Sequence, residues 1–597
     1  MALVNRTTQL RLRRLIRRRL RQVESTTEVA EKQLDYNLIA RLDRLLQVRR
    51  FTLGWLSLAV LLIFCTVTQT LSLSAYYQTI QPAPGGIYNE GIVGTYSNAN
   101  PIYATGSVDQ AVSRLIFAGL FKYNDQNQLT PDLATGYTVD TTGRHYVVKL
   151  KPGLTWQDGQ PLTATDVVFT YQLIQNPDAG SPLLQGWQNI TITAPNPLTV
   201  DFDLPNAFAA FPYSLVTGIL PEHILKDVPA TQMRANQFNT TAPVGAGPFS
   251  WQAIQASTGI DPSKSLSLIA LKPFNGYTGG KPKLDGFVLH VFGGQDAMVQ
   301  AFQHRTINAM AGLESVPNAI TSDTDANILN FSSTAAVMAF FKTSTGVLSD
   351  TKVRQAFVQG TDTTAILNSL GYTTLPVREP LLIGQLGYNP KYQQASYNPT
   401  AANQLLDSDG WVRGSNGIRA KASQQLAFSL YTEDTPENDK TADELIHYWS
   451  SLGANVTLVE QSPTDFQSTL AFHTYDALLD GISIGVDPDV FAYWDSSQAD
   501  VRSSSQLNFS EYKNPIADAS LEAGRTRLNS ALRIIKYQPF LQAWQSDAPA
   551  LGLYQPRILY ITRGTVYGLG EHTLNTDADR YGSVTDWEIR TVKITDQ

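Results

Sequence analysis

Gly481, Ser483 and Gly485 match the pattern G-x-S-x-G, the spacing at which serine hydrolases hold a nucleophile on a sharp turn between a strand and a helix. That turn needs a helix directly behind it, and an acidic residue and a histidine further along the chain. Pro488 interrupts a helix so close behind the serine, and His572 is the only histidine downstream. We therefore predict no catalytic residue and no enzymatic activity. Loss of activity on Ser483→Ala would be the test of an esterase.

The residue types that bind metals or phosphates are not grouped for that chemistry. The seven histidines show neither an i, i+4 pair nor a carboxylate cluster of the zinc-binding kind; they are His145, His223, His290, His304, His447, His473 and His572. Cys65 is the only cysteine, so the sequence predicts no disulfide and no thiolate metal site. The phosphate-binding pattern G-x-x-x-x-G-K-[ST] is absent from the sequence. We therefore predict no metal and no cofactor, and assign ATP hydrolysis to a partner.

Length and composition describe a folded protein with more than one core. Single hydrophobic cores stop growing at about 250 to 300 residues, so a chain of 597 residues predicts at least two lobes. Hydrophobic residues make up 43% of the chain and charged residues only 16%, as in globular proteins. Strand-like apolar runs at 266–271, 287–292 and 337–341 alternate with helix-like runs at 297–302 and 353–357. This pattern predicts an α/β fold.

The N-terminal region differs from the rest of the chain. Residues 1–50 contain 13 Lys and Arg against 5 Asp and Glu, whereas the whole chain has a net charge of -7. The run 51–75 has no charged residue and, at about 1.5 Å per residue, is long enough to cross a hydrocarbon layer of ~30 Å. Basic segments stay on the cytoplasmic side of a membrane. We therefore predict a single-pass protein of the cell membrane with a basic cytoplasmic segment (1–50), a transmembrane helix (51–75) and an extracytoplasmic large domain.

Several alternatives for this region stay open. Cleavage after the Ser-Leu-Ser at 72–74 would release the large domain, although a leader of about 50 residues before the apolar run is unusual for a signal peptide. A lipid anchor at Cys65 would need a small residue before it, where Phe64 stands. The basic segment is either a membrane-surface helix, a topology signal alone or a short helix-pairing surface. We predict no nucleic-acid binding, because its arginine-rich stretch lacks aromatic stacking residues.

Seven stretches of sequence, in a fixed order, resemble the signature of one protein family. They are GLFKYNDQNQLTPDLA (119–134), VVKLKPGLTWQDGQPLTATDVVFTY (147–171), ILPEHIL (219–225), PVGAGPF (243–249), KVRQAF (352–357), YNPTAANQLLDSDGW (397–411) and YDALLDGISIGVDPD (475–489). Taken alone, they supply turns and caps; Thr163 and Asp166, for example, predict a capping box at the start of a helix. Together they resemble the family 5 extracellular solute-binding proteins over roughly 86–566. The best-known members of that family bind oligopeptides and dipeptides.

The resemblance implies a two-lobed fold of the periplasmic-binding-protein type, in the large type II cluster with an extra subdomain. A linker at 76–86 precedes lobe I, which combines 87–336 with the return segment 549–597; lobe II (337–548) is inserted between them. Ligand capture is a hinge closure of the lobes. Members of the family feed ABC importers and catalyse no reaction. The resemblance thus implies a membrane-anchored monomer that captures a peptide or other small solute and delivers it to permease subunits with a separate ATPase.

The resemblance also implies where a peptide would be held. In peptide-binding members, an aspartate a few residues ahead of a DP-like pair holds the α-amino group of the ligand. Here that pair is Asp487-Pro488, and the position three residues before Asp487 is Ile484. An ammonium without a counter-charge in a closed cleft costs several kcal/mol. Either Asp487, which we favour, or Asp480 replaces the missing aspartate, or the ligand has no free amine.

Ligand class and biological role leave further alternatives. Saccharides and metal chelates compete with peptides, because the family includes nickel-binding members. Trp156, Trp411 and Trp494 are candidates to line the cleft, although for any one of them we expect core packing to be the commoner role. The same fold could serve a sensory or adhesion module outside transport. Neighbouring permease and ATPase genes would favour the importer over that module.

Overall fold

The computed structural model describes residues 10–11, 13–19, 32, 49–76, 78–256, 266–503 and 506–595 of the chain. Of the basic segment predicted at 1–50, which includes the proposed surface helix, residues 10–11 and 13–19 are helical and exposed, and most of the remainder lies outside the described residues. Contacts divide the chain into two compact units, Met1–Gln81 with Thr591–Gln597 and Pro82–Arg590.

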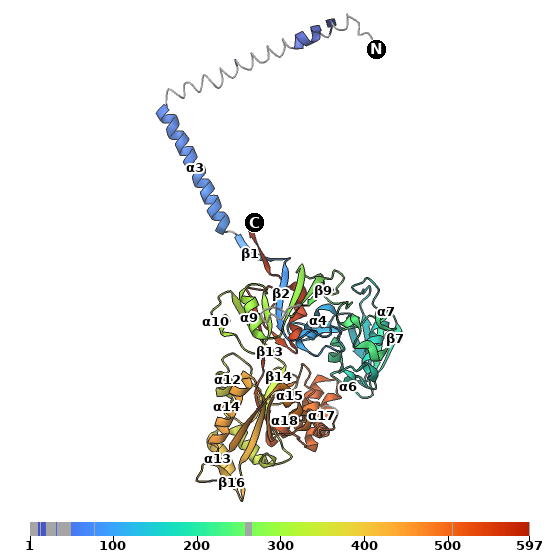
Figure 1. The fold of residues 1–597 in the computed structure, drawn as a ribbon, viewed down its shortest axis with the longest axis vertical. Coiled ribbons are helices and arrows are strands. Elements are labelled where there is room, and N and C mark those ends of the chain that lie inside the picture. Colours follow the sequence, from blue (N-terminus) through green and yellow to red (C-terminus); the bar gives the residue numbers. More distant parts are fainter. Residues whose placement is uncertain are drawn as a thin grey trace. The chain divides into compact units, whose positions relative to one another are not determined.

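The smaller unit contains a long apolar helix and a short β-ribbon. Within α3 (Arg49–Tyr76), the stretch Phe51–Ser72 is exposed along its length and is, among the described residues, the one helix long and apolar enough to cross a membrane. β1 (Gln78–Ala83) follows it and pairs with β24 (Arg590–Thr595), the last strand described (Figure 1). The predicted linker at 76–86 thus contains a strand.

Lobe I is built on an eight-stranded mixed sheet. In spatial order its strands are β23 (Thr573–Leu574), β13 (Ala326–Ser333), β22 (Arg557–Arg563), β12 (Ala309–Leu313), β2 (Ile87–Val93), β11 (Gly286–Phe292), β10 (Ser267–Pro273) and β9 (Phe249–Ala256). β2 pairs in parallel with both neighbours, and β11 is buried along nearly its whole length, as expected for a strand covered on both faces. α4 (Ser107–Ile116) and α9 (Gln295–Gln303) belong to separate hydrophobic clusters that cover this sheet.

An inserted four-stranded antiparallel sheet extends lobe I (Figure 1). Its spatial order is β5 (Ala134–Val139), β6 (His145–Leu150), β8 (Thr199–Asp203) and β7 (Thr191–Asn196), and α5 (Ala164–Gln175) packs on β7 and β8. The carboxylate of Asp166 accepts the backbone N–H of Thr163 at 2.8 Å, which confirms the predicted capping box. We identify this inserted sheet with the extra subdomain that the family resemblance implies.

Lobe II is built on a five-stranded sheet. Its spatial order is β19 (Asn455–Gln461), β18 (Ala427–Glu433), β20 (Ala477–Ser483), β14 (Ala335–Phe341) and β21 (Ala550–Tyr554), with β18 parallel to β19 and β20. α11 (Thr351–Gln359) and α14 (Pro436–Ser451) belong to the cluster on one face, and α15 (Pro463–Phe472), α17 (Pro515–Arg525) and α18 (Ser530–Asp547) to the cluster on the other. The chain therefore winds on both faces of this sheet.

The chain passes between the two sheets twice. β13 leads into β14 through Thr334 alone, and β21 leads into β22 through Gln555 and Pro556. The sequence placed the return to lobe I at 549, whereas Ala550–Tyr554 pairs with β14 of lobe II. All five residues of β21 are buried, although the strand lies at the edge of the sheet beside β14.

A buried ion pair ties the middle of the lobe I sheet to the C-terminal segment. Glu90 in β2 and Arg580 approach to 2.6 Å, with side chains 0% and 1% exposed, although they lie 490 positions apart in the sequence. The hydroxyls of Tyr560 and Tyr581 donate hydrogen bonds to the same carboxylate. Burial raises the pKa of both tyrosines well above the usual range, so both remain protonated donors. The carboxylate is therefore fully surrounded by donors.

Arg580→Met should destabilise the protein by about 3 to 5 kcal/mol, because it leaves the carboxylate of Glu90 buried without a cation. Denaturant unfolding of the full chain in detergent, followed by far-UV circular dichroism, measures the loss. The control is Arg502→Met, which removes the exposed pair with Asp500 and should leave the unfolding midpoint unchanged. Equal midpoints for Arg580→Met and the parent chain would contradict a stabilising role.

Candidate ligand-binding site

Two carboxylates lie on adjacent parallel strands in lobe II, Glu433 at the carboxyl end of β18 and Asp480 in the middle of β20. β18 ends at Glu433, and Tyr431 is opposite Leu478 of β20; the same register places Glu433 opposite Asp480. The helices that follow β18 and β20, α14 and α16 (Phe491–Trp494), belong to hydrophobic clusters on opposite faces of the sheet. Such a reversal of winding leaves a crevice at the strand ends, where α/β sheets bind ligands. Like charges directly opposite each other repel, so this arrangement favours a cation.

The pKa shifts of Asp480 and Glu433 also favour a cation between them. Burial and the charge of Glu433 raise the pKa of Asp480 to about 7, although the backbone N–H of Gly481 donates to it at 2.8 Å. Burial and the charge of Glu314, which follows β12 in lobe I, raise the pKa of Glu433. Within the described part of the chain, no Lys, Arg or His forms an ion pair with Asp480. Asp480 therefore has no cation of its own in the described residues, and a carboxylate of lobe I is close enough to influence Glu433.

Asp487, the candidate favoured from the sequence, already has a cation. Its two oxygens accept hydrogen bonds from Nη1 and Nη2 of Arg533 at 2.7 and 2.6 Å, and the Asp487 and Arg533 side chains are 9% and 6% exposed. Tyr123 and Tyr213 of lobe I stack at 6.5 Å, and burial, with a smaller contribution from the charge of Asp487, raises the pKa of both. Asp487 thus lies where the lobes meet, but a ligand ammonium would have to compete with Arg533.

Ile484, at the position of the missing aspartate, lies against the passage between the lobes. The backbone N–H groups of Ile484 and Gly485 donate to the carbonyl of Thr334 at 3.0 and 3.2 Å. The N–H of Thr334 donates to the carbonyl of Leu574 at 2.9 Å, and its hydroxyl donates to Asn575 at 2.9 Å. The Ile484 side chain is buried. This position therefore packs against the hinge instead of presenting a charge.

Neither of two pockets in this part of the protein is lined by Asp480, Glu433 or Asp487. The first, of about 320 Å³, lies on lobe I and is lined by residues that include Tyr123 and Asn575. The second, of about 720 Å³, lies between the lobes, with Phe208 on the side of the inserted sheet and Phe491 and Arg525 on the side of lobe II. Both volumes fall within the range of small-ligand sites.

Arg525, the last residue of α17, contacts both lobes. Its carbonyl accepts the N–H of Ala209 at 2.9 Å, and its guanidinium lies over the rings of Phe208 and Phe491 at 5.1 and 4.2 Å. Asp489 forms an ion pair with it at 3.1 Å. The lobes are therefore in contact here, beside the larger pocket.

The three tryptophans singled out from the sequence lie in hydrophobic cores. Trp156, Trp411 and Trp494 are all buried. Trp494 packs edge to face on Trp544 at 5.8 Å, and Trp411 lies in the lobe II cluster that contains Trp449. None of the three lines either of the two pockets. Their surroundings are those of core residues.

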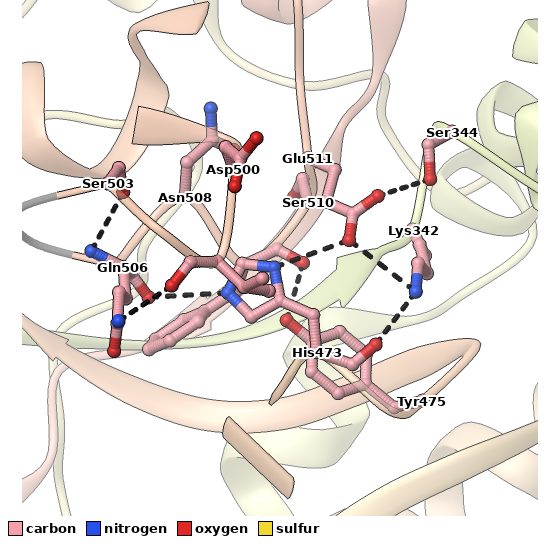
Figure 2. Close-up of polar contacts among 12 residues, drawn as sticks. Lys342, Ser344, His473, Tyr475, Asp500, Ser503, Gln506, Asn508, Ser510 and Glu511 are labelled. Carbon is pink, nitrogen blue, oxygen red and sulfur yellow. Dashed lines mark hydrogen bonds and ion pairs between the residues drawn. The ribbon is translucent and has the colours of Figure 1, made fainter. Parts of the chain in front are cut away.

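A polar cluster in lobe II was missed by the sequence analysis. Figure 2 shows His473, whose side chain is fully buried, between the carboxylate of Glu511 and the carbonyl of Gln506. Although burial raises the pKa of Glu511, hydrogen bonds from His473 and Ser344 and the charge of Lys342 lower it to about 2. His473 and Glu511 are 38 positions apart, and no spacing motif joins them. The cluster stabilises lobe II through bonds among its own members.

The described residues contain neither the strand–turn–helix arrangement of a serine hydrolase at Ser483 nor a group of side chains placed to bind a metal ion. Ser483 ends β20, and the next helix, α16, begins only at Phe491, so the strand–turn–helix of a hydrolase is not formed. His572 contacts the carbonyl of Gly570. No three His, Cys, Asp or Glu side chains in the described ranges are placed to hold a metal ion.

Comparisons with known proteins agree on one family. The model of the bacterial extracellular solute-binding proteins, family 5, matches residues 128–503. The oligopeptide-binding protein AppA of Bacillus subtilis is 25% identical over 520 residues, covering 84% of this chain and 91% of AppA. The structure of that AppA with a nonapeptide gives a TM-score of 0.67 at 23% identity, covering 85% of this chain and 100% of AppA.

Two further solved structures share the fold. The ABC transporter substrate-binding protein CtaP of Listeria monocytogenes gives a TM-score of 0.73 at 23% identity, covering 85% of this chain and 99% of CtaP. NikZ of Campylobacter jejuni in complex with Ni(L-His) gives 0.70 at 23% identity, covering 84% of this chain and 99% of NikZ. These matches confirm the predicted two-lobed α/β fold of periplasmic binding proteins.

The family match spans more than half of the chain and includes most of the stretches that carry the resemblance. Proteins of this family bind solutes and are not enzymes, in agreement with the sequence prediction. The chain therefore belongs to the family 5 bacterial extracellular solute-binding proteins.

Proposed function

We propose that this protein is the membrane-anchored, extracytoplasmic substrate-binding component of an ABC importer for peptides with a free amino terminus. The observation that carries the choice of ligand is Asp480, a carboxylate beside Glu433 without a cation of its own. The relative AppA, named as an oligopeptide-binding protein and solved with a nonapeptide, supports a peptide as the ligand.

In this proposal the peptide's α-ammonium lies between Asp480 and Glu433. The ammonium offsets the repulsion between the two carboxylates and donates charge-assisted hydrogen bonds. Asp487 keeps Arg533 as its partner and remains structural. The larger pocket between the lobes accommodates the remainder of the ligand. Closure turns about Thr334 and 555–556, and the bound solute passes to permease subunits served by a separate ATPase.

The proposed anchor is α3, uncleaved, with residues 1–50 in the cytoplasm. Its support is the apolar stretch Phe51–Ser72 together with Arg49 and Arg50 directly before it. The protein acts as a monomer whose large domain stays close to the permease in the same membrane.

A peptide with a free amino terminus should bind more tightly than its acetylated form. A charge-assisted hydrogen bond to an ammonium contributes about 1.5 to 3 kcal/mol, or roughly 10- to 150-fold in affinity. Asp480→Asn should remove this preference. Calorimetry with the full chain in nanodiscs measures it.

Asp487→Asn is the matched comparison. It should keep the preference but lower the unfolding temperature, because Arg533 loses its carboxylate partner. Loss of the preference in Asp487→Asn but not in Asp480→Asn would return the role to Asp487. Equal affinity for free and acetylated peptides would contradict an amine site, and binding of a metal chelate but no peptide would contradict the proposed substrate.

Affinity for such a peptide should fall as the pH drops below about 7. The carboxyl of Asp480 has a pKa of about 7 before ligand binds, so it becomes protonated and neutral below that pH and loses its attraction for the ammonium. Calorimetric titrations between pH 5.5 and 7.5 follow the change. Asp480→Asn, which keeps only the carboxyl of Glu433 to titrate, should bind weakly with a shallower profile, and an equally steep profile in this variant would exclude Asp480.

Protease added outside intact cells should remove a C-terminal epitope tag while an N-terminal tag stays protected, because the basic segment directs residues 1–50 to the cytoplasm. Immunoblots of both tags provide the readout. Permeabilised cells, in which both tags should be digested, are the control. Digestion of the N-terminal tag in intact cells would reverse the orientation, and a large domain released without protease would indicate cleavage.

A further inference from the structure

β1 and β24 form a two-stranded ribbon (Figure 1). Several of its apolar side chains are exposed in the described part of the chain. Side chains alternate between the two faces of a strand, so Val592 and Ile594 share one face of β24 and Lys593 lies on the other. Val592 and Ile594 are 44% and 42% exposed, and Ile80 of β1 is 62% exposed. Alternation of this kind is typical of a strand with one apolar and one polar environment.

Chain length limits the distance between this ribbon and the end of α3. The helix ends at Tyr76, and Ile80 is four positions further along. An extended chain spans at most about 3.6 Å per residue, so Ile80 lies within roughly 14 Å of Tyr76. The hydroxyl of Thr79 donates to the carbonyl of Ile594 at 3.5 Å, which brings β24 into the same range. The polar layer of a bilayer is itself about 5 to 8 Å thick on each side.

We propose that the ribbon is a membrane-contact surface, lying in the lipid headgroup layer with Val592 and Ile594 toward the hydrocarbon. The inference rests on the proposed anchor, since α3 must span the membrane to bring the ribbon there. The short covalent link to α3 gives the ribbon a high effective concentration at the lipid surface. A small apolar face is therefore sufficient to keep it there. The large domain is then attached to the membrane at both of its chain ends.

A single fluorescent label on either face of β24 tests this placement. Cys65 is the only cysteine, so Cys65→Ala gives a background in which Ile594→Cys, Val592→Cys or Lys593→Cys can each be labelled with the polarity-sensitive dye NBD. The full chain is reconstituted in phosphatidylcholine nanodiscs with or without lipids spin-labelled near the headgroup. Labels at 594 and 592 should emit at shorter wavelength than the label at 593, and the spin-labelled lipid should quench them about twofold more strongly.

Each other outcome overturns the proposal. Solvent-like emission at 592, 593 and 594 alike would show that the ribbon stays in water. A shift to shorter wavelength at 592 and 594 without quenching by lipid would show that protein, such as a second copy of the chain, covers this face. Flotation of the Cys65→Ala chain with vesicles tests the anchor separately: a chain that fails to float would overturn both anchor and ribbon, whereas a floating chain with solvent-like labels would overturn the ribbon alone.

Discussion

Thr334 connects the two lobes and also holds the segment that follows β20 in place. It is the single residue between β13 and β14, and it is one of the two connections between the large sheets of the protein; the other is 555–556. Its carbonyl holds the N–H groups of 484–485, and its own N–H and hydroxyl bond to Leu574 and Asn575 of lobe I. Rotation of one lobe against the other must turn about this residue and 555–556. The segment that follows β20 is therefore tied to the hinge itself.

The electrostatics of the site follow from the winding of the lobe II sheet. Because α14 and α16 cover opposite faces, the chain diverges after β18 and β20. Glu433 and Asp480 share that opening, whereas Asp487 and Asp489 are each matched with an arginine from α17 or α18. A carboxylate that its own protein leaves uncompensated is a mark of function rather than of stability. In the proposed site, ligand recognition by Asp480 and Glu433 is thus separate from the structural ion pairs of Asp487 and Asp489.

Sequence reasoning succeeded where local chemistry decides the outcome. The cap at Thr163 needs only two side chains three positions apart, and the apolar run at 287–292 can be covered on both faces only as an inner strand. It could not weigh Asp487 against Asp480, because the counter-charge of Asp487 comes from Arg533, 46 positions away. The tryptophans posed the same difficulty, since an aromatic ring suits a core and a cleft equally well. The apolar run Ala550–Tyr554 fits either sheet, and only its pairing with β14 decides.

The connections of the chain also determine which lobe can move. Both links to the smaller unit leave from lobe I: β1 leads into β2, and the segment after β23 leads into β24. Lobe II joins the rest of the protein only through Thr334 and 555–556. If α3 spans the membrane, lobe I is connected to the membrane-anchored unit at two chain ends, whereas lobe II is connected only to lobe I, through the hinge. In the proposed function, ligand exchange then requires rotation of lobe II, which breaks the contacts of Arg525 with Phe208 and Ala209.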